Sequence, residues 1–300
     1  MNLKYKYLLI VNPEAGSRQT LKALPAIEQR LKDEEIKFEF HFTSEPGHAT
    51  EIVKRYGKDF DVIVSVGGDG TINEVVNGMP DLNKPLGMIP VGTGNDFGRS
   101  CIIPHDNIDE ALNILLAHDV KQIDVGQVNE KRFVNVMGVG YEGRTNDVGK
   151  KLKFIKGVFR YILAIGYSFL TYRRIPMKIS FNDVVVDEPN FLMSVGNGWN
   201  VGGGVKLTPK ARLDDGLFDI CLVRNISRAQ IVMNLNRLYD GTMDVLPEVE
   251  MFQTDKVLIE SDQIIPMHLD GESVKPSNRL EISLHPKSLS VIGNWSKDPR

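Results

Sequence analysis

The sequence predicts two domains of different class, a Rossmann-like α/β domain at the N-terminus and a β-rich, β-sandwich-like domain after it. Strand and helix patterns alternate over residues 1–126, which is typical of a parallel sheet with helices on its faces. From residue 127 onward the alternation gives way to short strand patterns, which favour antiparallel sheets. Because the change of pattern at 124–127 is not a flexible linker, we expect the two domains to enclose a cleft.

The N-terminal domain begins with the buried strand pattern KYLLIVNP and repeats strand and helix patterns after it. The segment IKFEFHF alternates apolar and polar residues from Ile36 to Phe42, which is the period of a β-strand. The predicted elements, in order, are strand 6–13, helix 21–31, strand 36–42, helix 49–56, strand 62–66, helix 72–77, strand 85–92, helix 106–118 and strand 120–126.

The C-terminal domain consists mainly of short strand patterns, with two helices between them. Ser227 is a predicted helix cap, because its hydroxyl can accept a hydrogen bond from the first turn. The predicted strands are 133–139, 177–181, 184–187, 191–197, 217–223, 256–260 and 280–284, and the predicted helices are 154–173 and 228–239.

Composition and charge exclude several classes of protein. The chain has 36 Lys and Arg against 39 Asp and Glu, so it lacks the basic excess of a general nucleic-acid binder. Cys101 and Cys221 stand far apart and beside apolar residues, which favours a reducing cytoplasm over a disulfide framework. The six histidines show none of the spacings that bind zinc.

The strongest local signal is the run Gly67-Gly68-Asp69-Gly70-Thr71, which follows an apolar strand and precedes a helix. Glycine allows close approach of the backbone to a ligand, and a helix N-terminus favours phosphate. The Asp69 carboxylate would repel bare phosphate, unless Mg²⁺ lies between them. The run therefore indicates a nucleotide triphosphate with magnesium, although a tight strand-to-helix turn also uses Gly and Asp.

A second loop of similar composition, 92–96, follows the next predicted strand. It contains Gly92, Thr93, Gly94, Asn95 and Asp96, and it falls at the sheet edge where open α/β folds bind ligands. With two such loops, a turn explanation must hold separately for each of them, so a ligand that both loops bind is the better explanation. The end of the first strand adds a third candidate contact, the segment NPEAG, which taken alone is a turn.

Three further motifs fail on inspection. Gly138, Gly140 and Gly143 match GxGxxG, but no acidic residue follows at the distance a dinucleotide site needs. Residues 143–151 resemble a P-loop with the wrong spacing and with Lys where Ser or Thr belongs. Asp96-Phe97-Gly98 spells the protein-kinase DFG without the other kinase motifs.

Four ordered segments, GGDGTINEVVNG, VGTGNDFGR, LDDGLFDI and LDGE, resemble the bacterial diacylglycerol kinase-like lipid kinases. That family includes the catalytic domains of eukaryotic diacylglycerol and sphingosine kinases. NAD kinases and phosphofructokinases share GGDG, but Asn95-Asp96 and Asp270-Gly271-Glu272 separate this chain from them. The resemblance implies an ATP-binding domain 1–126 completed by 287–300, and a lipid-substrate domain 127–286.

The resemblance also implies roles for individual residues. Glu272 would be the base for the lipid hydroxyl, and Asn73 and Glu74 would support the start of the helix after Asp69. Asp69, Asp96 and Asp124 would form the acidic network around catalytic Mg²⁺. The residues that would contact ATP are Asn12, Thr43, Gly67, Gly68, Asp69, Gly70, Thr71, Glu74, Thr93 and Asn95. Without the resemblance, Glu272 could instead belong to the tip of a hairpin, and Asp124 could instead cap the end of a strand.

A second, structural magnesium is implied in the segment LDDGLFDI. Its ligands would be the Asp215 carboxylate and the main-chain carbonyls of Arg212 and Leu217, a set of hard oxygens that suits Mg²⁺. A β-turn built on Asp-Gly is the alternative. One departure from the family pattern is the bulky Tyr141-Glu142 pair in a segment that would line the lipid pocket, which leaves the acceptor open.

The expected activity is transfer of the ATP γ-phosphate to a lipid hydroxyl, with diacylglycerol as acceptor and phosphatidic acid as product. The alternatives are a kinase of a soluble acceptor, such as NAD or a sugar phosphate, and a catalytically silent lipid- or nucleotide-binding protein. We expect a cytoplasmic protein with transient peripheral contact to the membrane, since basic residues flank the apolar helix 154–173. A core helix with solvated ends is the alternative, and a homodimer paired through an edge strand is possible.

Overall fold

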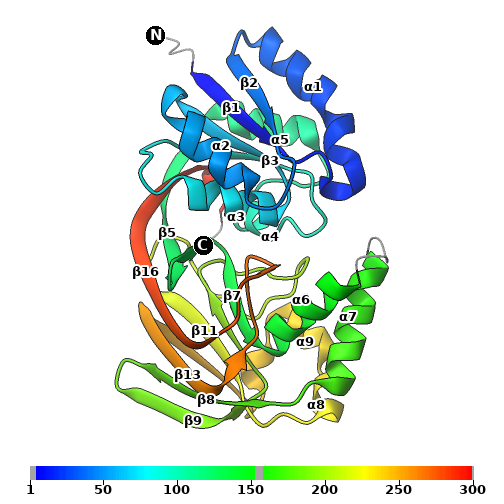
Figure 1. Cartoon of the computed structure of the whole chain (residues 1–300), viewed down its shortest axis with the longest axis vertical. Coiled ribbons are helices and arrows are strands. Elements are labelled where there is room, and N and C mark those ends of the chain that lie inside the picture. Colours follow the sequence, from blue (N-terminus) through cyan, green and yellow to red (C-terminus); the bar gives the residue numbers. More distant parts are fainter. Residues whose placement is uncertain (1–4, 153–157, 299–300) are drawn as a thin grey trace. The chain divides into compact units, whose positions relative to one another are not determined.

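The chain divides into two units in the computed structural model, which describes residues 5–152 and 158–298 (Figure 1). Unit 1 comprises Met1–Ile123 with Lys287–Arg300, and unit 2 comprises Asp124–Pro286. The expected helix start at 154, together with Lys153, Phe154, Ile155 and Lys156, lies outside the described residues.

Unit 1 is built on a parallel sheet with the strand order β2-β1-β3-β4-β16. The inner strands β1, β3 and β4 are almost fully buried, which explains their continuous apolar sequences. β2 lies at the edge, and its burial varies along the strand as its period of two predicted. The strands are β1 (Lys6–Val11), β2 (Lys37–Phe42), β3 (Val62–Gly67), β4 (Leu86–Pro90) and the end of β16 (Ser277–Ile292).

Helices cover both faces of this sheet, as expected for an α/β domain. Ile27 of α1 and Leu112 of α5 pack with Leu9 and Val64 on one face, while α2 and α3 pack against each other. α3 begins at Asp69 rather than at Ile72, so the carboxylate of the glycine-rich run belongs to the helix itself. The helices are η1 (Ala15–Arg18), α1 (Gln19–Asp33), α2 (His48–Tyr56), η2 (Gly57–Asp59), α3 (Asp69–Gly78), α4 (Asp96–Ser100), α5 (Ile108–Ala117) and η4 (Trp295–Lys297).

Unit 2 is a sandwich of two sheets, which confirms the predicted β-rich class. One sheet has the order β12-β11-β10-β7-β14-β15, and the other contains β16-β13-β8-β9, with β5 beside β16 and β6 beside β5. Phe133, Met193 and Phe218 meet Ile179 and Ile259 in the core between them. The strands are β5 (Val120–Val128), β6 (Lys131–Phe133), β7 (Val136–Gly140), β8 (Ile175–Phe181), β9 (Val184–Asn190), β10 (Leu192–Gly196), β11 (Phe218–Val223), β12 (Val249–Thr254), β13 (Lys256–Ile265), β14 (Met267–Leu269) and β15 (Glu272–Ser273).

Helical segments pack on the outer face of the six-stranded sheet of unit 2 (Figure 1). Leu192 and Cys221 point to this face and form a second core with Tyr172 and Ile226. Helix α6 was not predicted, and the predicted helix 228–239 divides at Asn234. The segments are α6 (Tyr141–Lys151), α7 (Val158–Thr171), α8 (Arg228–Met233), α9 (Leu235–Asp240) and η3 (Met243–Val245).

Strand β16 takes part in the sheets of both units. Residues from Ser277 onward pair with β13 in unit 2, whereas Val291 pairs with Leu86 of β4 in unit 1. The last strand of the chain therefore completes the sheet with which the chain begins.

Within residues 5–152 and 158–298, no helix combines the length and apolar character needed to cross a membrane.

The capping box at the start of α8 gives a stability prediction. The Gln230 N–H donates to Ser227 Oγ (3.2 Å), and the Ser227 N–H donates to Gln230 Oε1 (2.9 Å). We expect Ser227→Ala to lower the free energy of unfolding of unit 2 by about 1 kcal/mol, because a first-turn amide loses its partner. Ser227→Asn, which retains a capping oxygen, should stay close to the parent protein in urea unfolding. Equal stability of the alanine variant would contradict this expectation.

Candidate active site

The carboxyl ends of β1, β3 and β4 bring three glycine-containing loops to one edge of the unit 1 sheet. β1 and β3 are neighbours in the sheet. From β1 the chain continues through α1 to β2 on one side, whereas from β3 it continues through α3 to β4 on the other side. Such a reversal of strand order is the topological switch point at which open α/β sheets bind ligands. The loop segments are 12–16 after β1, 67–71 from the end of β3 into the start of α3, and 91–96 from the end of β4 to the start of α4.

The loops after β3 and β4 contact each other through glycine backbone. A Cβ atom on Gly92 would lie 2.5 Å from the Gly68 Cα, so any side chain there would push the loops apart. Asn95 closes the loop after β4, because its Oδ1 accepts the Gly92 N–H (2.9 Å) and its Nδ2 donates to the Gly92 oxygen (2.8 Å). This side chain, predicted to contact ATP, therefore also builds the loop.

The loop after β1 is attached to the other two. Asn12 Nδ2 donates to Thr71 Oγ1 (3.1 Å), which joins two of the residues predicted to contact ATP. Gly16 has a φ of 57°, and a Cβ atom there would lie 2.0 Å from the Val91 oxygen. A glycine is therefore required at this position both by its conformation and by the closeness of the neighbouring backbone.

The start of α3 has the properties of an anion site. Its cap residue Gly68 is extended, and no side chain caps this end of the helix. An α-helix leaves its first N–H groups without partners within the helix, and its N-terminus carries partial positive charge. The backbone from Gly67 to Thr71 therefore suits a phosphate group.

Two carboxylates flank the same loops. A Cβ atom on Gly94 would lie 3.0 Å from Asp69 Oδ2 and 3.2 Å from Asp96 Oδ2, so both carboxylates lie close to Gly94 and to each other. Asp69 is also oriented by the Phe97 N–H, which donates to its Oδ1 (3.1 Å). Mg²⁺ bound with nucleotides takes one or two carboxylates and completes its shell with phosphate and water, so this pair fits the metal.

Thr43 and Glu74 lie beside the loop edge in different roles. The Thr43 N–H donates to the Val11 oxygen (2.9 Å), which places Thr43 next to Asn12. The Glu74 carboxylate accepts the N–H groups of Gly47 (2.8 Å) and Ala49 (3.2 Å). Glu74 therefore holds the start of α2, whereas the resemblance implied support for the helix that contains it.

Asp124, the third acid of the predicted magnesium network, belongs to unit 2. Its N–H donates to the Leu213 oxygen (2.6 Å), and its Oδ2 accepts the Gly216 N–H (2.7 Å). Both contacts hold the segment that contains Asp215. Burial raises the pKa of the Asp215 carboxyl, and the neighbouring Asp124 carboxylate raises it further.

The predicted structural magnesium would lie in this crowded acidic segment. The Leu217 N–H donates to Asp215 Oδ1 (3.1 Å), and Gly216 between them has a φ of 80°. A cation at the Asp215 carboxylate would offset the burial and the neighbouring Asp124 charge, which together raise its pKa. The segment therefore fits a hard cation, with the Arg212 and Leu217 carbonyls as the further expected ligands.

The segment LDGE forms a hairpin in unit 2. β14 and β15 are joined by Asp270 and Gly271, whose φ values are both positive, as a type I′ turn requires. The buried Asp270 carboxylate accepts the N–H groups of Val134 (3.0 Å), Asn135 (2.8 Å) and Val136 (3.1 Å). Glu272 follows the turn, its side chain 53% exposed and 3.6 Å from the Lys150 ammonium.

Two family models match the two parts of the chain. Residues 6–128 match the diacylglycerol kinase catalytic domain, and residues 135–293 match the YegS C-terminal NAD kinase beta sandwich-like domain. The chain is 32% identical to a diacylglycerol kinase of Bacillus subtilis (strain 168) over 268 residues, which is 88% of each protein. The chain belongs to the diacylglycerol kinase catalytic domain family.

Further relatives match this kinase in sequence and in structure over nearly its whole length. It is 31% identical to a diacylglycerol kinase of Staphylococcus aureus (strain MRSA252) over 284 residues, which cover 92% of this chain and 90% of the relative. The crystal structure of a diacylglycerol kinase from Bacillus anthracis strain Sterne superposes with a TM-score of 0.78 at 28% identity. That superposition covers 98% of this chain and 99% of the other.

The candidate residues of the kinase are divided between its units. Asn12, Thr43, Gly67 to Thr71 and Asn95 gather at the unit 1 loop edge, with Thr93 exposed beside them. Among the described residues, no three His, Cys, Asp or Glu side chains gather as a metal site. The network of Asp69, Asp96 and Asp124 therefore stays a prediction.

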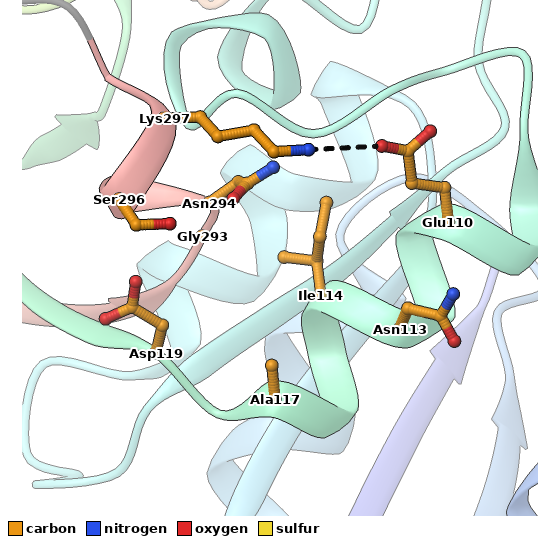
Figure 2. Close-up of a pocket in the computed structure, with 9 residues that line it drawn as sticks. All are labelled: Glu110, Asn113, Ile114, Ala117, Asp119, Gly293, Asn294, Ser296 and Lys297. Carbon is orange, nitrogen blue, oxygen red and sulfur yellow. Dashed lines mark ion pairs between the residues drawn. The ribbon is translucent and has the colours of Figure 1, made fainter.

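A separate cavity of about 310 Å³ lies in unit 1, between α5 and the C-terminal segment (Figure 2). Glu110 and Lys297 face each other there, 3.9 Å apart, with Ile114 below them. None of the predicted site residues lines this cavity, and it lacks the glycine loops that would admit phosphate. We assign it no part in the candidate active site.

Two residues that contact each other at the β14–β15 hairpin were not predicted from the sequence. Glu142 at the start of α6 contacts His268 of β14, with 3.2 Å between Oε2 and Nε2. The two positions lie far apart in the sequence, so no local pattern joins them. The one available signal was that Tyr141-Glu142 departs from the family pattern. Tyr141 itself stacks on Phe191, with 4.8 Å between ring centroids.

The glycine contact gives a prediction for nucleotide binding. We expect Gly92→Ala to weaken Mg-ATP binding by about tenfold or more, because displacement of the two loops costs at least about 1.4 kcal/mol of binding free energy. Isothermal titration calorimetry measures this directly. Gly166→Ala in α7 is the matched control, since a Cβ atom there meets nothing within 4 Å. Unchanged affinity in the Gly92 variant would contradict the assignment of these loops.

Proposed function

We propose that this kinase transfers the γ-phosphoryl group of ATP to the hydroxyl group of a lipid, with diacylglycerol as acceptor and phosphatidic acid as product. The observation that carries the proposal is the meeting of three loops at the start of α3, beside the carboxylates of Asp69 and Asp96. Relatives named diacylglycerol kinase, at about the same length, support the choice of acceptor.

The unit 1 residues bind and orient the donor in this proposal. The backbone N–H groups of the Gly67–Thr71 run donate to phosphate oxygens, and the helix start favours their negative charge. Asn12 and Asn95 keep the loops at the spacing that the phosphates need, through their bonds to Thr71 and Gly92. Asp69 and Asp96 would hold Mg²⁺, which when bound neutralises charge on the phosphates.

Glu272 accepts the acceptor's proton in this proposal. The lipid hydroxyl oxygen forms a bond to the γ-phosphorus, its proton passes to the Glu272 carboxylate, and the bond from the γ-phosphorus to the β,γ-bridging oxygen breaks to release ADP. An alcohol is a weak nucleophile, so a carboxylate held in reach of its proton assists the step. Glu272 is solvent-exposed, which leaves its side chain accessible to an acceptor.

A labelling experiment tests this function. Wild-type protein with γ-labelled ATP, Mg²⁺ and diacylglycerol in mixed micelles should give an organic-extractable labelled product. We expect Asp69→Ala and Glu272→Ala to lower the rate by about 100-fold or more, as loss of a metal ligand or general base does. Label that enters added NAD or sugar phosphate instead would show a soluble acceptor. Mg-ATP binding without turnover on any acceptor would show a silent binding protein.

We further propose that α7, α8 and α9 of unit 2 meet an anionic membrane surface, where a cytoplasmic protein finds a lipid acceptor. Large apolar side chains are exposed on these helices, most strongly Leu170 (73%) and Met233 (74%). The others are Leu163, Ile165, Tyr167, Val232, Leu235 and Tyr239. The Arg228 guanidinium joins α8 to the end of α7 by donating to the oxygens of Phe169 (2.8 Å) and Leu170 (3.2 Å).

Charge on this surface also suits anionic lipid. Arg173 is exposed directly after α7, and α7 and α8 contain no acidic residue. Basic residues beside exposed apolar side chains are the usual composition of an interfacial helix. Lys150, one of the basic residues that precede the predicted helix 154–173, donates instead to the Ser273 oxygen (2.7 Å) next to Glu272. A charge reversal at Lys150 would therefore disturb the candidate base as well as any membrane contact.

Flotation with anionic vesicles tests the surface. We expect the double variant Leu170→Glu with Met233→Glu to bind phosphatidylglycerol-containing vesicles at least about tenfold more weakly, because two apolar side chains no longer enter the interface. Val185→Glu in β9 is the control, since Val185 is 60% exposed and lies on the other sheet. Equal flotation of the double variant and the parent would refute the proposal.

A further inference from the structure

The Glu272 side chain is more than half exposed and forms an ion pair with Lys150 at 3.6 Å, so its direction also depends on the backbone that carries it. It depends on the turn that precedes it, where Leu269 pairs with Glu272 across Asp270 and Gly271. Asp270 fastens one side of that turn to the backbone of residues 134–136. Gly271 has a positive φ and no side chain, so a contact that restrains this side of the turn must be made to its backbone.

A buried pair of side chains supplies this contact. His268 is 2% exposed and Glu142 is 11% exposed, and Glu142 Oε2 lies 3.2 Å from His268 Nε2. The other ring nitrogen of His268, Nδ1, accepts the Gly271 N–H at 3.2 Å. A continuous chain of hydrogen bonds therefore runs from α6, through the imidazole, to the backbone directly before Glu272.

The Gly271 bond fixes the tautomer of His268. A backbone N–H can only donate, so Nδ1 must carry a lone pair, and the ring proton belongs on Nε2. That proton points to the Glu142 carboxylate, which holds the imidazole in the orientation that keeps Nδ1 facing Gly271. Glu142 thus acts on the turn through the ring, as a carboxylate does when it orients a metal-binding histidine.

Two glycines make room for the pair. A Cβ atom on Gly138 would lie 2.4 Å from His268 Nε2 and 2.6 Å from Glu142 Oε2. A Cβ atom on Gly143 would lie 2.3 Å from the Pro266 carbonyl group, where α6 crosses the chain just before β14. The spacing that imitates a dinucleotide fingerprint is therefore explained by the packing of α6 on this hairpin.

The same helix holds the hairpin at its other end. Glu142 stands in the first turn of α6 and Lys150 in the last, and Lys150 Nζ donates to the Ser273 oxygen at 2.7 Å. Residues on both sides of Glu272 are therefore fastened to one rigid element.

We propose that Glu142 and His268 are positioning residues, which orient the Glu272 carboxylate by holding the Gly271 N–H. This inference rests on the proposed function of Glu272 as the base. According to the inference, Glu142 and His268 affect turnover as well as stability. A small displacement of a catalytic group can lower the rate by a large factor.

Two substitutions of His268 separate the two halves of the hydrogen-bond chain. In His268→Asn, the side-chain oxygen falls near the place of Nδ1 and can accept the Gly271 N–H. In His268→Gln, the amide nitrogen reaches the place of Nε2 and can donate to Glu142, while Gly271 loses its acceptor. We expect kcat to fall by about 10- to 100-fold in His268→Gln, with the KM for ATP unchanged. His268→Asn should recover part of the loss, because it restores the acceptor for Gly271 but not the link to Glu142.

Hydrogen–deuterium exchange supplies a readout that needs no activity. The Gly271 amide should exchange faster in His268→Gln than in the parent protein and should stay protected in His268→Asn. Unchanged exchange at Gly271 in His268→Gln would overturn the inference even if the wild-type protein phosphorylated no lipid. Where the wild type is active, equal kcat losses in both variants, with faster exchange throughout unit 2, would show a structural role only and would also overturn it.

Discussion

The approach of two glycine backbones, Gly68 and Gly92, is the constraint on which the unit 1 site depends. Their contact fixes the spacing between the loops that follow β3 and β4, and the other contacts are arranged around that spacing. Asn95 shapes one loop by bonding both the N–H and the oxygen of Gly92, and Asn12 ties in the loop after β1 through Thr71. The Phe97 N–H orients the Asp69 carboxylate, and the Asp69 and Asp96 carboxylates both lie close to Gly94.

Those features that depend on local sequence could be predicted. Buried parallel strands show continuous apolar runs, and the turn pair Asp270-Gly271 has the composition of the hairpin that it forms. The strand order of unit 1 places the loops after β3 and β4 side by side, as the repeated strand and helix patterns indicated. The fold class followed from these patterns because each of them involves neighbours in the chain.

Features that depend on distant partners could not be predicted in the same way. Helix α6 contains Gly143, Asn146, Asp147 and Gly149, which are poor helix formers, and its contacts with the β14–β15 hairpin come from more than 100 positions away. Glu74 was predicted to support the start of the helix that contains it, but its carboxylate accepts N–H groups at the start of α2. His268 belonged to no recognisable spacing, because its partners are a helix start and a turn amide rather than other ligands.

The path of β16 has a consequence for how the protein is made. Unit 2 is an insertion within unit 1, so Val291 and Ile292 leave the ribosome only after the whole of unit 2. Until they arrive, the β4 edge of the first sheet has no partner strand, and the core around Val64 lacks Ile292. Unit 2 is continuous in sequence and can fold while synthesis continues, so the unit 1 sheet is completed only after all of unit 2 has been made.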